Sequence, residues 1–172
     1  MNEHRLQLAF HWSQERRYDF MIPNCYFNGW EMDICAFRKG SRYIEEIEIK
    51  TSASDFHNDF KKTVHRRGLK HELLRDGKLA SNYFAFLVPA DLFDTLWEGQ
   101  HFPSYAGIYV ARMSEPRPHR RGFLSVECRR SPKLLHKTKP TESLCFKMAR
   151  KTTFRYWREL HGNQKRRDDG KG

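Results

Sequence analysis

The sequence lacks several features that would assign it to a special class of protein. Its 172 residues contain no apolar run near the ~20 residues needed to cross a bilayer, which excludes a membrane-spanning helix. The first residues carry no apolar segment typical of a secretion signal, so we expect a cytoplasmic protein of a bacterial or phage-infected cell. No internal repeat or low-complexity stretch is present. These absences predict one globular domain over residues 1–161 and a basic, flexible tail over 162–172.

Cysteine is scarce and is not spaced for metal binding. The four cysteines include no C-x-x-C pair, and the nine histidines form no cluster with the spacing of metal ligands. A zinc knuckle or ribbon is therefore not expected. Cys25 and Cys35 lie in strand-like runs and predict buried thiols, which fits a reducing compartment.

Acidic residues are scarce in the last third of the chain. Residues 112–172 hold 18 of the 32 Lys and Arg residues but 6 of the 21 Asp and Glu residues, a net charge of +12, whereas residues 1–111 carry −1. A basic surface of this kind favours a polyanionic partner, and nucleic acid is the usual one. The alternative is a solubilising surface with a disordered basic tail.

Hydrophobic periodicity predicts an α/β domain with a mixed sheet flanked by helices. The first three strands form an antiparallel meander, because Asn28-Gly29 is a strong hairpin signal and residues 38–41 form a second turn. Ser54 is the expected N-cap of the second helix, which Gly68 interrupts or splits. The expected elements are a helix over 4–17, strands over 18–28, 30–37 and 42–50, a helix over 54–74, a strand over 82–88, a helix over 90–98, strands over 106–113 and 122–129, and a helix over 141–160.

The third strand carries an unusual pattern of charge. Glu46, Glu48 and Lys50 share one face of it, since side chains alternate along a strand. The turn before this strand places Asp33 of the neighbouring strand near Glu48. Two neighbouring carboxylates repel unless a cation lies between them, and Mg²⁺ takes one or two carboxylates plus waters. Glu-x-Lys alone is more often a solvated strand face; the alternating apolar strand, the neighbouring Asp33 and the basic chain favour a metal site instead.

These residues also carry a family resemblance. Asp33, then fourteen residues, then Glu48-Ile49-Lys50, in α-β-β-β-α-β order, resembles the PD-(D/E)xK nuclease superfamily. The stretch 47–52, followed by Asp55-Phe56 and 59–61, looks more particularly like the MmcB-related group of proposed DNA-repair nucleases. The resemblance covers roughly residues 5–157. The proline of the first motif is absent here, because Met32 precedes Asp33.

The resemblance implies a restriction-endonuclease-like core and a Mg²⁺- or Mn²⁺-dependent deoxyribonuclease. We expect an endonuclease of DNA repair, recombination or phage DNA processing, which can act as a homodimer. Asp33 and Glu48 would hold the metal, with the backbone carbonyl of Ile49 as a third ligand, and Lys50 would assist the attacking water. The first helix often adds a carboxylate, for which Glu15 is the stronger candidate and Glu3 the weaker one. Glu31 could join the metal or be a plain surface residue.

Further polar residues are candidates for binding DNA. Asp55, Asp59 and Lys62 share one helical face, which is either an ordinary exposed face or a support for Lys50. Late in the chain, aromatic residues interleave with basic ones and could stack on the bases of a single strand, but Leu144, Met148, Phe154 and Trp157 are predicted to face inward. The candidates for nucleic-acid contact are Ser52, Lys61, Lys62, Arg66, Arg67, Arg120, Arg121, Arg129 and Arg130.

Two other functions remain open from the sequence. The first is a nucleic-acid-binding module that keeps the nuclease fold and does not cut. The second is an enzyme or binder directed at RNA, which no RNA-binding motif of the sequence supports or excludes.

Overall fold

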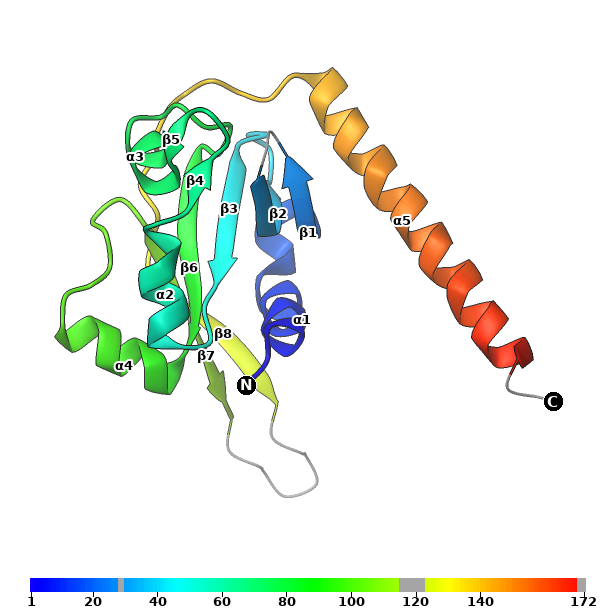
Figure 1. Cartoon of the computed structure of the whole chain (residues 1–172), viewed down its shortest axis with the longest axis horizontal. Coiled ribbons are helices and arrows are strands. Elements are labelled where there is room, and N and C mark those ends of the chain that lie inside the picture. Colours follow the sequence, from blue (N-terminus) through cyan, green and yellow to red (C-terminus); the bar gives the residue numbers. More distant parts are fainter. Residues whose placement is uncertain (28–29, 115–122, 170–172) are drawn as a thin grey trace. The chain divides into compact units, whose positions relative to one another are not determined.

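Six strands form one mixed sheet in the order β1-β2-β3-β6-β7-β8 (Figure 1). The computed structural model describes residues 1–27, 30–114 and 123–169, and it describes side chains as far as Arg158. The main elements are α1 (Glu3–Gln14), β1 (Tyr18–Phe27), β2 (Trp30–Arg38), β3 (Ile44–Ile49), α2 (Ala53–Asp59), β4 (Thr63–Val64), β5 (Gly68–Leu69), α3 (Lys70–Arg75), β6 (Tyr83–Pro89), α4 (Ala90–Glu98), β7 (Gly107–Met113), β8 (Leu124–Arg130) and α5 (Glu142–Asp169); a single 3-10 turn, Glu15–Arg17, follows α1.

The predicted class, an α/β fold with a mixed sheet flanked by helices, is confirmed. Strands β1, β2 and β3 form the predicted antiparallel meander. Strand β3 then pairs in parallel with β6, and β6 in parallel with β7, through crossovers that contain helices, as parallel pairing requires. The apolar run of β6 is buried from Phe84 to Pro89 between these two neighbours. Asn28 and Gly29, predicted as the first hairpin turn, lie outside the described residues.

Helix α1 covers one face of the sheet. Its N-cap is Asn2, whose side chain accepts a hydrogen bond from the backbone N–H of Arg5 at 3.0 Å. Leu6 and Phe10 are fully buried and pack with Ile47 and Ile49 of β3. The side chains that alternate with these isoleucines, Glu46, Glu48 and Lys50, therefore lie on the opposite face of the sheet, toward α2 and α3 (Figure 1).

The predicted helix over 54–74 is not continuous: the interruption expected at Gly68 is present, but it begins earlier, after Asp59. Helix α2 is capped by Ser52 rather than Ser54, since the Ser52 hydroxyl accepts a hydrogen bond from the Asp55 N–H at 3.2 Å. It ends at Asp59, and a short hairpin, β4–β5, separates it from α3. Arg66 and Gly68 have φ values of 58° and 116°, which a continuous right-handed helix does not allow. The hairpin turns the chain back, so α3 also faces β3.

The chain forms two compact units, Met1–Lys139 and Pro140–Gly172. The second holds α5, which runs to Asp169, beyond the predicted end near residue 160. Met148 is buried as predicted, but Phe154 and Trp157 are 55% and 54% exposed, so their predicted inward orientation is wrong. Within the described residues no helix is long and apolar enough to cross a membrane.

Candidate functional site

The pairing of β2 with β3 places Asp33 beside Glu48. Ile34 pairs with Ile47 in an antiparallel register, so the next residues outward along the two strands are Asp33 and Glu48. Asp33 Oδ2 accepts a hydrogen bond from the backbone N–H of Ile49 at 2.6 Å, which holds the carboxylate at the end of β3. The predicted proximity of Asp33 and Glu48 follows from this register.

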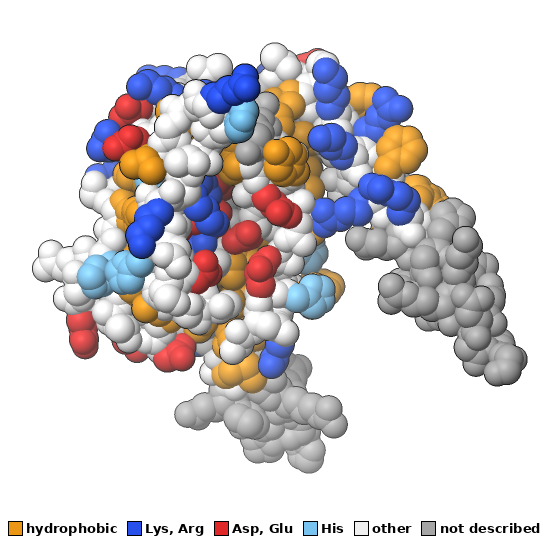
Figure 2. Space-filling view, viewed as in Figure 1, with side chains coloured by type: hydrophobic (Ala, Val, Ile, Leu, Met, Phe, Trp, Pro, Cys, Tyr) orange, Lys and Arg blue, Asp and Glu red, His pale blue; other side chains and the backbone are white. Residues whose placement is uncertain are grey.

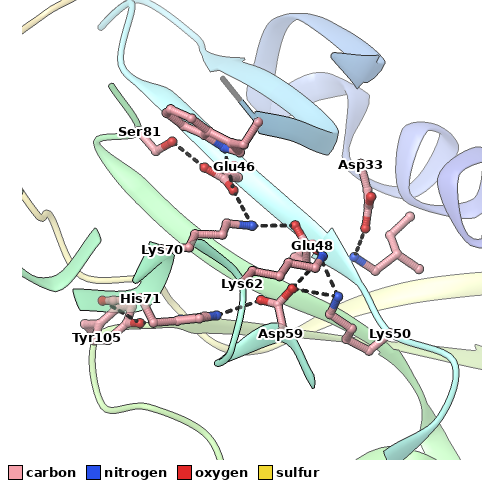
Figure 3. Close-up of polar contacts among 12 residues, drawn as sticks. Asp33, Glu46, Glu48, Lys50, Asp59, Lys62, Lys70, His71, Ser81 and Tyr105 are labelled. Carbon is pink, nitrogen blue, oxygen red and sulfur yellow. Dashed lines mark hydrogen bonds and ion pairs between the residues drawn. The ribbon is translucent and has the colours of Figure 1, made fainter. Parts of the chain in front are cut away.

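Three lysines surround the Glu48 carboxylate, which is 1% exposed (Figure 3). Glu48 Oε1 lies 2.9 Å from Lys50 Nζ and 2.6 Å from Lys62 Nζ. Glu48 Oε2 lies 2.7 Å from Lys70 Nζ, which also contacts Glu46 at 2.9 Å. Lys50 and Lys70 are buried, whereas the side chain of Lys62 is 48% exposed. Lys62 is therefore the lysine of this group that solvent reaches.

Asp59 joins this group from the end of α2. Its Oδ1 lies 2.9 Å from Lys50 Nζ and 2.7 Å from Lys62 Nζ. Its Oδ2 lies 2.6 Å from Nε2 of His71, whose Nδ1 lies 2.6 Å from the Tyr105 hydroxyl. The Asp59 carboxylate thus fixes the position of Lys50. We call Glu46, Glu48, Lys50, Asp59, Lys62 and Lys70 the ion-pair cluster.

The ion-pair cluster balances its own charge, with three carboxylates against three ammonium groups. Burial alone would raise the pKa of Glu48, but the charges of Lys70 and Lys50 lower it below its ordinary value. Burial also opposes the charged form of Asp59, and the hydrogen bond from His71 with the charge of Lys70 lowers its pKa. Both carboxylates are therefore ionised at neutral pH, and their removal would leave buried lysines unpaired.

The pKa of Asp33 is shifted in the opposite direction to the pKa values of Glu48 and Asp59. Burial, followed by repulsion from Glu48, raises the pKa of Asp33 to about 7, and the charge of Lys50 lowers it only slightly. Asp33 is thus only partly ionised at neutral pH, and the lysines do not neutralise the charge that it carries. Figure 2 shows acidic side chains gathered at the centre of this face of the molecule, beside Lys and Arg side chains. A cation next to Asp33 would be favoured electrostatically.

The donor set fits a hard divalent cation. Asp33, Glu48 and the carbonyl of Ile49 offer oxygen atoms at the end of β3, and Mg²⁺ binds through one or two carboxylates while keeping several waters. Among the described residues no group of three or more His, Cys, Asp and Glu side chains could hold a metal ion. A fully protein-made metal cage is therefore not formed there.

The additional carboxylates predicted for the metal, Glu15, Glu3 and Glu31, occupy different positions relative to Asp33. Glu15 is exposed and follows the C-terminal end of α1. Glu3, at the N-terminal end of the same helix, is the α1 carboxylate whose charge raises the pKa of Asp33. Glu31 is exposed on β2, two residues before Asp33. The structure thus brings Glu3 toward Asp33 rather than Glu15, the candidate that the sequence favoured.

The predicted nucleic-acid contacts are scattered over the first unit. Lys61 is exposed after α2, and Arg66 and Arg67 are exposed near the β4–β5 turn. Arg129 is exposed on β8 and lies 3.5 Å from Glu127. Arg130 instead donates to the carbonyls of Pro103 and Ala106, so its guanidinium is used inside the fold. Arg120 and Arg121 lie outside the described residues, and Ser52 caps α2.

Sequence reasoning missed several members of the buried group. The sequence pattern places Glu46 on the correct face but gives it no role, and it predicts either an exposed helical face or support of Lys50 for Asp59. Asp59 is buried, so the second interpretation is the one that the contacts favour. Lys70 and His71 were not singled out. Their placement depends on the β4–β5 hairpin, which has only two residues in each strand and leaves little signal in the sequence.

Comparison with known proteins adds information about the fold alone. No family model matches the chain, and no curated protein matches it. Among solved structures, the chain is similar to a protein of unknown function from Silicibacter pomeroyi, with a TM-score of 0.61 and 15% sequence identity. The alignment covers 100% of this chain and 96% of that one. At this identity the similarity shows that the two chains share a fold, and it carries no function.

Proposed function

We propose that the chain is a metal-dependent nuclease with a restriction-endonuclease-like core that cuts DNA at the end of β3. One observation carries the proposal: Asp33 lies beside Glu48, and the Glu48 carboxylate contacts the buried Lys50 at 2.9 Å. Carboxylates at this spacing with an adjacent lysine suit phosphodiester hydrolysis, because a bound Mg²⁺ or Mn²⁺ would supply an activated water and polarise a phosphoryl oxygen. The net charge of +11 favours the polyanionic substrate.

Each residue of the site has a separate role in this proposal. Asp33 and Glu48 would hold the metal, with the carbonyl of Ile49 as a further ligand. Lys50 orients the attacking water and stabilises the negative charge that grows on the phosphorus centre. The water oxygen forms a bond to phosphorus as the bond to the 3′ oxygen breaks; the water gives up a proton to solvent and the 3′ oxygen takes one up, which leaves a 5′-phosphate and a 3′-hydroxyl. Lys62, the half-exposed lysine of the cluster, is the one that would give up its contact with Glu48 to make room for a metal.

Asp59 and His71 act on this reaction through Lys50. The Asp59 carboxylate holds Lys50 Nζ at 2.9 Å, and His71 holds Asp59 from the other side. Asp59 is therefore a positioning residue rather than a catalytic one.

The test is a cleavage assay with labelled single-stranded, duplex, nicked and branched DNA in Mg²⁺, Mn²⁺ or EDTA. The proposal expects metal-dependent cutting that Asp33→Ala and Lys50→Ala abolish. Asp94→Ala, which changes an exposed carboxylate of α4, is the control and should cut like the wild type. Full metal-dependent cleavage by both site variants would overturn the proposal.

A second function has one observation in its favour. The ion-pair cluster is neutral without a metal, because Lys50, Lys62 and Lys70 already neutralise the carboxylates around Glu48. A nucleic-acid-binding module that keeps the fold and does not cut would need no metal at these carboxylates. Salt-dependent binding of DNA with no cleavage in any divalent metal would support it. Competition between matched DNA and RNA duplexes would identify the preferred nucleic acid.

A further inference from the structure

Helix α5 exposes four large aromatic side chains on a surface that carries many cations. Phe146, Phe154, Tyr156 and Trp157 are 68%, 55%, 57% and 54% exposed. Aromatic side chains of this size supply much of the apolar area that a fold buries, so their exposure together on one helix is costly. Over residues 141–158 the helix has five Lys and Arg residues and one acidic residue, Glu142.

Three of the exposed aromatics and most of these cations share one side of α5. At about 100° per residue, seven side chains lie within an arc of about 140°. We call them the aromatic–basic face: Phe146, Lys147, Arg150, Lys151, Phe154, Trp157 and Arg158. All seven are exposed, whereas Leu144, Met148 and Thr152, on the other side, are buried or half-buried. Tyr156 is exposed outside this arc.

Cations and aromatic rings are neighbours within the aromatic–basic face, where Arg150 falls between Trp157 and Phe154 around the helix. Arg150 lies over the ring of Phe154, with its guanidinium carbon 5.3 Å from the ring centroid. Neighbouring rings and cations match single-stranded nucleic acid, in which unpaired bases stack on aromatic rings while the phosphates between them meet cations.

We propose that the aromatic–basic face of α5 binds single-stranded nucleic acid. Phe146, Phe154 and Trp157 stack on unpaired bases, and Lys147, Arg150, Lys151 and Arg158 bind the neighbouring phosphates. A duplex keeps its bases stacked inside, so it offers this face phosphates but no free base surface. The inference deepens the proposed function, on which its biological role rests, by assigning a substrate with an unpaired strand.

The test measures binding separately from cleavage. The full chain carrying Asp33→Asn is titrated in EDTA against fluorescent oligonucleotides of equal length: single-stranded DNA, single-stranded RNA and duplex DNA. We expect tighter binding of the single strands than of the duplex. Trp157→Ala and Phe154→Ala should each weaken single-strand binding about five- to a hundredfold, with little change for the duplex. Alanine is a better helix former than either aromatic residue, so the helix is retained, which circular dichroism checks.

Two further variants assign the effect to the face. Trp12→Ala removes a tryptophan that is 70% exposed on α1 and should leave single-strand binding unchanged. The double variant Arg150→Ala/Lys151→Ala should weaken binding of both strand types and reduce the salt dependence. Tighter binding of DNA than of RNA, or the reverse, identifies which single strand the face takes.

Several outcomes would overturn the inference. One is equal binding of single strands and duplex, with no loss in Trp157→Ala. Another is a change in oligomeric state, rather than in affinity, when the aromatics are removed, which would mean that a second copy covers the face. A third is binding to vesicles of anionic phospholipid and not to the oligonucleotides. A chain that binds through α5 but never cuts would leave the inference standing and remove the nuclease proposal; a chain that cuts normally with Trp157→Ala and binds single strands as before would do the reverse.

Discussion

Both faces of β3 bury carboxylates, but the partners of these carboxylates differ between the two faces. On the α1 face, Glu45 lies 2.7 Å from Arg38 and accepts a hydrogen bond from the Tyr109 hydroxyl at 2.8 Å. On the α2–α3 face, Glu48 meets three lysines, and Asp33 beside it has a raised pKa. Burial of a charged group therefore does not mark a site by itself. What separates the two faces is an adjacent carboxylate without a compensating charge.

The energetic expectations for the two faces also differ. Glu45 has one cationic partner, from β2, and one hydroxyl partner, from β7, which is the arrangement of a structural ion pair. The ion-pair cluster draws on α2 and α3 and includes a half-exposed lysine. If the comparison is correct, changes on the first face should affect stability alone, and changes on the second should affect stability and activity.

The largest expected effect is on cleavage by Glu48→Gln. The amide cannot hold a cation as a carboxylate does, so we expect metal-dependent cleavage to fall about a thousandfold, which corresponds to roughly 4 kcal/mol of barrier. The matched variant on the other face, Glu45→Gln, should stay within about threefold of wild type per folded molecule. Initial rates on labelled DNA, normalised to the folded fraction, measure both. Similar losses in the two variants would remove the functional distinction between the faces.

Next in size is the effect of Asp59→Ala on stability. The change leaves the buried ammonium of Lys50 without one of its two close partners and removes the partner of His71. We expect the free energy of unfolding to fall by about 3 kcal/mol, because a buried charge is left uncompensated. Urea denaturation at pH 7 measures it. Asp55→Ala is the control, since Asp55 is half exposed and 3.7 Å from Lys50; its variant should lose less than about 1 kcal/mol.

A smaller effect that depends on pH is expected for Asp33→Asn. The folded pKa of about 7 lies above the ordinary 3.8, so between these values the folded chain holds a proton that the unfolded chain has lost. The free energy of unfolding of the wild type therefore falls as pH rises from about 4 to 7. Asp33→Asn removes this loss, and we expect a gain of about 2 kcal/mol at pH 8 and none at pH 4, after allowance for the partial exposure of Asp33.

Urea denaturation at the two pH values, with Asp94→Asn as control, decides this prediction. Mg²⁺ should stabilise the wild type at pH 8 and leave Asp33→Asn unchanged, because ligands that bind the folded state alone raise its stability. If the free energy of unfolding of Asp33→Asn rises equally at pH 4 and pH 8, then the pKa of the Asp33 carboxyl is not raised in the folded chain.

The smallest expected effect is that of Tyr109→Phe on the α1 face. It deletes the hydroxyl that donates to Glu45 while Arg38 remains. We expect a loss of about 1–2 kcal/mol in the free energy of unfolding and no change in cleavage. A Tyr109→Phe chain that cuts markedly less than wild type would show that the two faces are coupled through β3.

Much of the fold could be predicted from the sequence because its strands carry clear patterns. Alternating Ile47 and Ile49 against Glu46 and Glu48 fixes both the strand and its two faces. The β4–β5 hairpin could not be predicted, since its strands are too short to show a period. At α5 the 3.6-residue period was visible, but arginines interleave with its aromatics, so hydrophobicity alone could not decide which side was exposed.

The site could be predicted only where its members are close in sequence or on paired strands. Asp33, Glu48 and Lys50 meet this condition through a single turn. Lys70 lies 22 residues from Glu48 and reaches it only after the chain has reversed at the hairpin. Its long-range contact needs the tertiary structure, and a lone lysine in a basic chain gives no sign of it.

Neutralisation of Glu48 by Lys62 and Lys70 has a consequence for purifying the protein. Many metalloproteins need their ion to fold, because the unloaded site leaves like charges facing one another. Here lysines from the same chain neutralise the buried carboxylates. The folded chain should therefore survive purification in a chelator with little loss of thermal stability. Metal would then bind reversibly to a chain that is already folded, and activity should return when the ion is added back.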